Sequence, residues 1–167
     1  MLFRSTTRYS IAAGLHALCH QPELLGQMQA GGTVWDTAPD EIIRWGSATT
    51  YFRRTATRDF DLHGKQVKAG QKVIYWWASG NRDERVLDDP MRVNLMRSPN
   101  RHLSFGQGGP HVCLGMWLAR LEVRVLFQEL LKQLACNAHF TVFKCLQPLH
   151  VEGVRSGRYF FRTRCFS

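Results

Sequence analysis

A glycine-dense loop that runs directly into a helical pattern constrains this chain of 167 residues more than any other feature. Residues 105–115, which we call the Cys loop, read FGQGGPHVCLG and hold four glycines and one cysteine, Cys113. Glycine adopts backbone conformations that other residues avoid, so this segment breaks regular structure. From the end of this loop onward, apolar residues recur at helical spacing, at Leu114, Trp117, Leu118, Leu121, Val125 and Leu131. The sequence therefore predicts a loop that delivers one cysteine to the first turn of a long helix.

A cysteine at the start of a helix lies in an environment that favours its thiolate. The helix N-terminus offers unpaired N–H groups and a positive potential, which lower the pKa of a thiol. Gly115 lets the backbone approach the sulfur closely, and the apolar Phe105 helps to exclude water. Such a buried, hydrogen-bonded thiolate suits an axial ligand of haem iron. A catalytic or redox thiol is the alternative, whereas a dinucleotide-binding loop fails because His111 stands where its third glycine should be.

The charge does not define a partner. The formal net charge is +9 at pH 7, but the basic residues are scattered and no nucleic-acid-binding motif accompanies them. A basic face for an acidic protein partner fits the charge equally well. We therefore expect no nucleic-acid partner, and keep a basic nucleic-acid-binding domain as a weaker alternative.

Five cysteines, an odd number, argue against a disulfide framework and favour a reducing compartment, so we expect a cytoplasmic protein. A zinc site can be drawn from Cys136, His139, Cys145 and His150, but its spacing matches no common pattern. A packed or surface cluster is the simpler interpretation of His16, Cys19 and His20. No apolar run approaches the ~20 residues that a membrane span needs.

The remaining segments predict a mixed architecture. Residues 5–20 have a helical apolar face that Pro22 ends, and Thr37 is a candidate N-cap for a short helix over residues 39–45. Residues 49–77 have strand character, with turns at His63-Gly64 and Ala69-Gly70. Residues 78–104 show no sustained period and predict a long loop. After residue 135 only weak alternation remains, which predicts at most a short β-hairpin.

The Cys loop resembles the haem-binding loop of the cytochrome P450 family. The pattern Phe-Gly-x-x-Gly-x-His-x-Cys-x-Gly is met at every fixed position of residues 105–115. The resemblance implies haem b as cofactor and Cys113 as the ligand of its iron. It also implies that Phe105, His111 and Gly115 help to bind the cofactor, with His111 at a propionate.

Further family elements resemble segments upstream, in the family's order. The Glu-x-x-Arg pair of the family's K helix matches Glu41 and Arg44, and Arg92 falls where the meander completes a Glu-Arg-Arg triad. The resemblance implies a structural role for this triad. Arg54 matches a strand arginine that pairs with a haem propionate. Ser5-Thr6-Thr7-Arg8 resembles the distal I helix, with Thr6 as the catalytic alcohol and Ser5 in place of the family's usual acid.

The resemblance implies a fold that is mainly α with a smaller β part, the C-terminal part of the P450 fold. Its elements are an I-helix remnant, K helix, β-hairpins, meander, Cys loop and L helix. Residues 1–134 would form a partial haem domain and residues 135–167 a divergent tail. The implied activity is oxygen-dependent hydroxylation of a small apolar substrate, such as a steroid, terpenoid or branched lipid.

The same resemblance implies a ferredoxin or flavin-type electron donor. Because the resemblance covers no segment from the first half of the family's fold, a non-catalytic fragment is the alternative. We accordingly expect the isolated chain to bind haem weakly or not at all.

Overall fold

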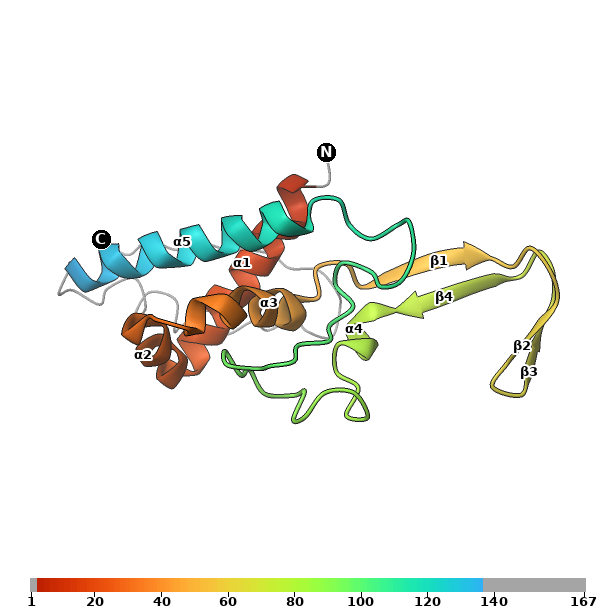
Figure 1. Cartoon of the computed structure of the whole chain (residues 1–167), viewed down its shortest axis with the longest axis horizontal. Coiled ribbons are helices and arrows are strands. Elements are labelled where there is room, and N and C mark those ends of the chain that lie inside the picture. Colours follow the sequence, from red (N-terminus) through yellow and green to blue (C-terminus); the bar gives the residue numbers. More distant parts are fainter. Residues whose placement is uncertain (1–2, 137–167) are drawn as a thin grey trace, which may run out of the picture.

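The computed structural model describes residues 3–136, and its largest elements are four helices (Figure 1). They are α1 (Phe3–His20), α2 (Pro22–Ala30), α3 (Val34–Gly46) and α5 (Met116–Cys136). The short helix α4 (Trp77–Gly80) follows a pair of small antiparallel sheets. The described part of the chain is therefore mainly α with a smaller β part, as the sequence predicts.

The core lies where α1, α3 and α5 pack together. Its members are buried apolar side chains contributed by four helices and by the loop before the Cys loop: Ala17, Leu18, Leu24, Leu25, Met28, Val34, Trp35, Ala38, Ile42, Ile43, Val93, Leu95, Val123, Phe127 and Leu131. At Gly14 the three helices come closest, because a Cβ atom there would lie 2.8 Å from Ile42 Cγ2 and 2.8 Å from Phe127 Cζ. Both neighbours are buried and have little room to move. This crossing requires a residue without a side chain.

We expect Gly14→Ala to lower the free energy of unfolding by about 1–3 kcal/mol through overpacking. The direction is informative because alanine in an unhindered helix stabilises by up to about 1 kcal/mol relative to glycine. Gly26 in α2 provides the control, since nothing lies within 4 Å of a Cβ atom built there. Urea unfolding should show destabilisation for Gly14→Ala and a small gain for Gly26→Ala. Gains at both positions would contradict the close helix crossing.

Helix α2 is not predicted by the sequence, where Pro22 is taken only as the end of the preceding helix. The structure places Pro22 in the first turn of a new helix, a position at which its missing N–H costs nothing. Leu24, Leu25 and Met28 form the buried face of α2. Proline here ends one helix and begins the next.

Helix α3 begins five residues earlier than the sequence predicts. It starts at Val34 and continues through Pro39, so the prediction of Thr37 as an N-cap is wrong. The Thr37 hydroxyl instead contacts the carbonyl of Leu95 at 2.6 Å. Because the helix begins early, Asp40 and Glu41 lie in its middle, where their side chains meet partners from distant segments.

The β part is a long hairpin with a second, short pair of strands at its far end. Strand β1 (Tyr51–Thr55) pairs with β4 (Lys72–Trp76), and β2 (Phe60–Leu62) pairs with β3 (Lys65–Val67). The predicted turn at His63-Gly64 is confirmed, with φ of 51° and 79° at its two residues. Figure 1 shows this hairpin extending away from the helices. Most of its side chains are exposed in the described structure.

Helix α5 carries two apolar stripes. The stripe that is buried in the core is not the one that the sequence predicts. Val123 and Phe127 are fully buried, and Leu131 continues their stripe. The predicted face is largely exposed apart from Leu131: Leu114 before the helix, then Trp117, Leu118, Leu121 and Val125. Helix α5 thus packs its Val123–Phe127–Leu131 stripe on α1 and α3 and leaves an apolar stripe open beside the Cys loop.

Candidate functional site

Cys113 lies at the end of the Cys loop and is exposed. Its backbone N–H donates to the carbonyl of Phe105 at 2.9 Å, and its carbonyl accepts from Met116 N–H at 3.2 Å. It therefore stands three residues before the first residue of α5 instead of within the first turn, one tight turn earlier than predicted. Gly106, Gly108 and Gly109 have φ of 76°, 60° and 130°, values that side chains disfavour. These glycines allow the loop to fold back, so that the Cys113 N–H reaches the Phe105 carbonyl.

The Cys loop lies next to Trp77 of α4, and this ring stacks in turn on the β-hairpin. A Cβ atom on Gly106 would lie 3.7 Å from the Trp77 ring and 3.7 Å from the His111 carbonyl oxygen. Trp77 in turn stacks on Phe52 of β1, with ring centroids 4.7 Å apart. The Arg54 guanidinium lies over the same Phe52 ring, 5.7 Å from its centroid. The structure thereby connects the strand of Arg54 to the Cys loop through two stacked aromatic rings.

The other predicted site residues take different positions. His111 and Arg54 are exposed, and Arg54 donates to the carbonyl of Arg53 at 3.1 Å. Phe105 is half-buried and packs against the core, and Gly115 is buried directly before α5. Thr6 is half-buried on α1, eight residues before Gly14, which is about 12 Å along a helix axis. The role of each remains a proposal.

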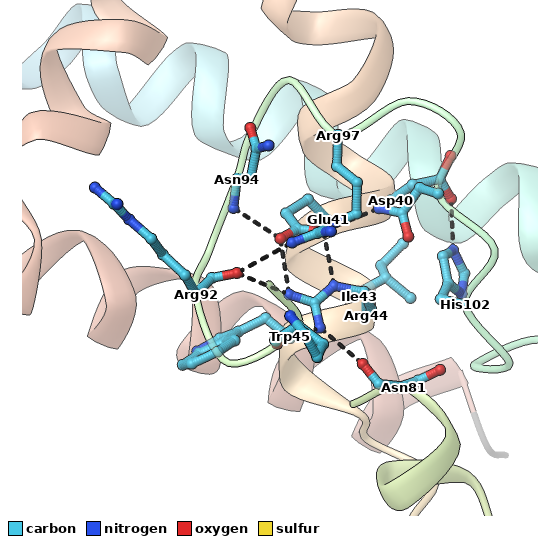
Figure 2. A network of polar contacts seen from close by, with 12 residues as sticks. Asp40, Glu41, Ile43, Arg44, Trp45, Asn81, Arg92, Asn94, Arg97 and His102 are labelled. Atoms are coloured by element: carbon cyan, nitrogen blue, oxygen red, sulfur yellow. Dashed lines mark hydrogen bonds and ion pairs between the residues drawn. The ribbon is translucent and has the colours of Figure 1, made fainter. Parts of the chain in front are cut away.

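Glu41 and Arg44 form a buried bidentate ion pair on α3 (Figure 2). Arg44 Nε donates to Glu41 Oε2 and Arg44 Nη2 to Glu41 Oε1, both at 2.8 Å, and both side chains are 0% exposed. Arg44 Nη1 reaches across to the carbonyls of Asn81 at 2.7 Å and Pro90 at 2.9 Å. This arginine therefore joins α3 to two separate parts of the loop that follows the sheet.

The third member of this network is Arg97, not Arg92. Arg97 is buried and its Nε donates to Glu41 Oε2 at 3.1 Å. Arg92 contributes its backbone carbonyl, which accepts from Arg44 Nη2 at 3.2 Å. Its own side chain is exposed and points away from Glu41 in Figure 2. The prediction of Arg92 as the triad arginine is therefore corrected, and we call Glu41, Arg44 and Arg97 the buried ion network.

Glu41 collects further donors beyond the two arginines. The backbone N–H of Asn94 donates to Oε1 at 2.8 Å, and the amide of Asn100 donates to Oε2 at 3.0 Å. Burial alone raises the pKa of this carboxyl, but the hydrogen bonds from Arg44 and Asn94 and the two arginine charges outweigh it and lower the pKa below its usual value. Glu41 thus fastens the loop after the sheet to α3.

A second polar cluster, absent from the sequence predictions, joins α3 to α5. Asp40 Oδ1 accepts from Arg120 Nε at 2.8 Å and contacts His102 Nε2 at 2.9 Å. His102 Nδ1 accepts from Ser104 N–H at 3.2 Å, so the ring proton lies on Nε2 and is donated to Asp40. Burial raises the pKa of Asp40, and these two partners together lower it below its usual value. The Arg120 guanidinium also lies 5.1 Å from the Phe105 ring centre.

Asn81 is another buried polar residue that the sequence does not predict. Its side-chain amide donates to the hydroxyls of Ser47 and Ser104, both at 2.9 Å, and its oxygen accepts from Leu103 N–H at 2.6 Å. Asn81 therefore connects the end of α3 with the residues that lead into the Cys loop.

Within the described part of the chain, no three His, Cys, Asp or Glu side chains gather as a metal site would require. His16 and His20 are exposed and stack with ring centroids 4.2 Å apart. They form a surface cluster, as expected from the sequence. The zinc alternative depends on His139, Cys145 and His150, which lie outside the described residues, as does the side chain of Cys136.

Among residues 3–136, no helix combines the length and the apolar character needed to cross a membrane.

Comparison with known proteins identifies the family of this chain. A family model described as cytochrome P450 matches residues 36–144, which include the buried ion network and the whole Cys loop. The chain belongs to the cytochrome P450 family. The resemblance seen in the sequence is thereby confirmed, together with the fold class, the C-terminal part of the P450 fold.

Individual P450 relatives agree with the family model. The methyl-branched lipid omega-hydroxylase of Mycobacterium tuberculosis is 47% identical over 133 residues, 77% of this chain and 30% of the relative. The steroid C26-monooxygenase of the same organism is 35% identical over 163 residues, 96% of this chain and 36% of the relative. The solved structure of Mycobacterium marinum cytochrome P450 CYP268A2 in complex with pseudoionone is 46% identical, with a TM-score of 0.76 over 78% of this chain and 32% of that one. The chain spans about a third of the length of the relatives it matches.

Proposed function

We propose that this chain forms the thiolate-binding part of a haem monooxygenase, with Cys113 as the ligand of the iron of haem b. The observation that carries the proposal is the Cys loop itself. Its glycines fold it so that the Phe105 carbonyl holds the backbone of Cys113 while the thiol stays exposed. Leu114 and Trp117, which follow Cys113 closely in the sequence, are exposed apolar side chains. One accessible thiol beside apolar surface is the donor set that a thiolate-bound haem requires.

The neighbouring residues have complementary roles in this proposal. The side chains of Arg54 and His111 are exposed and can donate hydrogen bonds. We assign each of them to one of the two haem propionates. Phe105 and Gly115 support the Cys loop from its two ends, Phe105 by its carbonyl and Gly115 by allowing close backbone approach. The hydroxyl of Thr6, on α1, would hold and pass a proton on the oxygen-binding side.

When bound, the haem supplies the activation of molecular oxygen, using electrons from a ferredoxin or flavin-type donor. We propose a small apolar substrate of the steroid, terpenoid or branched-lipid class. The names of the relatives support this class, since one is a methyl-branched lipid omega-hydroxylase and another a steroid C26-monooxygenase. We also propose residues 1–134 as the haem-domain portion, residues 135–167 as a distinct tail, and a cytoplasmic location.

The ligand assignment is tested in a hybrid, in which residues 3–136 replace the matching segment of the Mycobacterium marinum relative, by adding haemin, reducing it and recording the carbon monoxide spectrum. We expect the band of thiolate-bound haem with the natural sequence and its complete loss in Cys113→Ala. Cys19→Ala is the matched control, because Cys19 lies on α1 and should leave the band unchanged. Retention of the band in Cys113→Ala would reject the assignment.

A hybrid distinguishes an active part from a non-catalytic fragment. The same hybrid would be compared with the isolated chain. We expect the hybrid to show the thiolate band and the isolated chain to bind haem weakly or not at all. If neither chain nor hybrid gave the band, the proposed function would be wrong.

A further inference from the structure

Asn81 has every polar atom of its side chain engaged, although it lies in a loop and is fully buried. Its amide nitrogen donates to the hydroxyls of Ser47 and Ser104, and its amide oxygen accepts from Leu103 N–H. Its backbone carbonyl accepts from Arg44. One residue thus contacts both the buried ion network and the chain that enters the Cys loop.

A short series of hydrogen bonds leads from Asn81 to Cys113. The Leu103 N–H is fixed on Asn81 Oδ1, and the Leu103 carbonyl accepts from Gly106 N–H at 2.8 Å. These two bonds define the turn that contains Phe105, whose carbonyl accepts from Cys113 N–H at 2.9 Å. Ser104 adds an anchor, because its hydroxyl donates to the Ile43 carbonyl at 3.2 Å. The direction of the Phe105 carbonyl therefore depends on how residues 103–106 are held.

Close packing at the residue before Asn81 gives independent support. A Cβ atom on Gly80 would lie 2.5 Å from Leu103 Cδ1, nearer than real side chains approach. Helix α4 and Asn81 are therefore pressed against Leu103 by both packing and hydrogen bonding. A residue that served only to fill the core would not need to meet this backbone amide.

We infer that Asn81 is a positioning residue for Cys113: it holds residues 103–106 so that the Phe105 carbonyl fixes the backbone of the cysteine. The consequence for a bound haem rests on the proposed function. The effect on Cys113 itself does not, because it concerns contacts within this chain.

Amide hydrogen exchange of the purified chain, without haem, tests this inference. In Asn81→Ala the Cys113 and Gly106 amides should exchange faster by about tenfold, the factor that corresponds to one hydrogen bond. Asn81→Asp keeps an acceptor for Leu103 N–H and should restore part of the protection. Met28→Ala is the control, since Met28 is equally buried but lies on α2. It should lower the urea midpoint without a selective change at Cys113.

An unchanged Cys113 amide in Asn81→Ala, or equal acceleration at all amides in Asn81→Ala and Met28→Ala, would overturn the inference. If Asn81→Ala does not fold, Gly80→Ala replaces it, because its methyl group would lie 2.5 Å from Leu103 Cδ1 and crowd that side chain while the polar side chains stay in place. Faster exchange at Cys113 in Gly80→Ala supports the inference, and unchanged exchange rejects it.

A second readout uses haem in the same variants of the hybrid with the Mycobacterium marinum relative. Asn81→Ala should take up haem with a smaller fraction in the thiolate band, whereas Met28→Ala should keep the wild-type fraction. An equal fraction in both variants would count against the positioning role. If the unsubstituted chain and the hybrid with the Mycobacterium marinum relative both lacked the band, the proposed function would fail. The exchange data would still decide the role of Asn81.

Discussion

Glu41→Gln should lower the free energy of unfolding by roughly 3–5 kcal/mol, the cost of leaving a buried charge without its partner. Arg44 is 0% exposed and directs two of its nitrogens at the Glu41 carboxylate, and Arg97 directs a third. A glutamine at this position keeps the shape but removes the negative charge and turns one acceptor into a donor. Urea unfolding followed by circular dichroism measures the change.

An exposed pair of the same spacing provides the control for this substitution. Glu129 and Lys132 lie three residues apart on α5, as Glu41 and Arg44 do on α3, and their charged atoms are 2.6 Å apart. Both side chains are more than half exposed, so the pair is worth at most about 1 kcal/mol. Glu129→Gln should therefore have little effect. Equal losses from the two substitutions would show that burial of the network does not determine its contribution.

The family resemblance indicates the Glu41–Arg44 pair, and the structure contains it as a buried ion pair. Both residues lie on one helix, where a spacing of three places them on the same face. The third partner comes from a loop, and there the prediction selects Arg92. The loop itself holds a signal that identifies Arg97. Val93, Leu95 and Arg97 are buried while Asn94 and Met96 are exposed, so burial alternates along this part of the loop. Arg97 continues this alternation, since it lies two residues after Leu95. Arg92 does not, since it lies directly before Val93.

Other differences have physical causes of their own. Proline is compatible with the first turn of a helix as well as with the end of the preceding one, so Pro22 alone does not reveal α2. Both apolar stripes of α5 have helical spacing, and the packed one is decided by contact with Ile42 and Gly14 on other helices. The side-chain partners of Asn81 and the carboxylate partner of His102 lie 22 to 62 residues away in the sequence. No local period can predict such contacts, because they depend on how α3 is placed against the loop.

Arg97→Ala should cost about 3 kcal/mol, whereas Arg92→Ala should change the stability by less than about 0.5 kcal/mol. The Arg97 guanidinium is buried against Glu41 and also donates to the carbonyls of Asp88 and Asp89. Its removal leaves these acceptors without their donor inside the protein. The Arg92 carbonyl, which accepts from Arg44, is retained in Arg92→Ala because the backbone is unchanged.

A double-mutant cycle separates the ion pair from the general loss of buried contacts. If the contact between Arg97 and Glu41 carries the effect, Arg97→Ala combined with Glu41→Gln should destabilise by less than the sum of the two single changes. The carboxylate that Arg97 neutralises is then no longer present, so its loss leaves less uncompensated charge. The Arg92→Ala change combined with Glu41→Gln should be additive, because the Arg92 side chain is exposed and points away from the carboxylate. Strong coupling of Glu41 to Arg92 but not to Arg97 would return the triad to the arginine that the family resemblance first indicates.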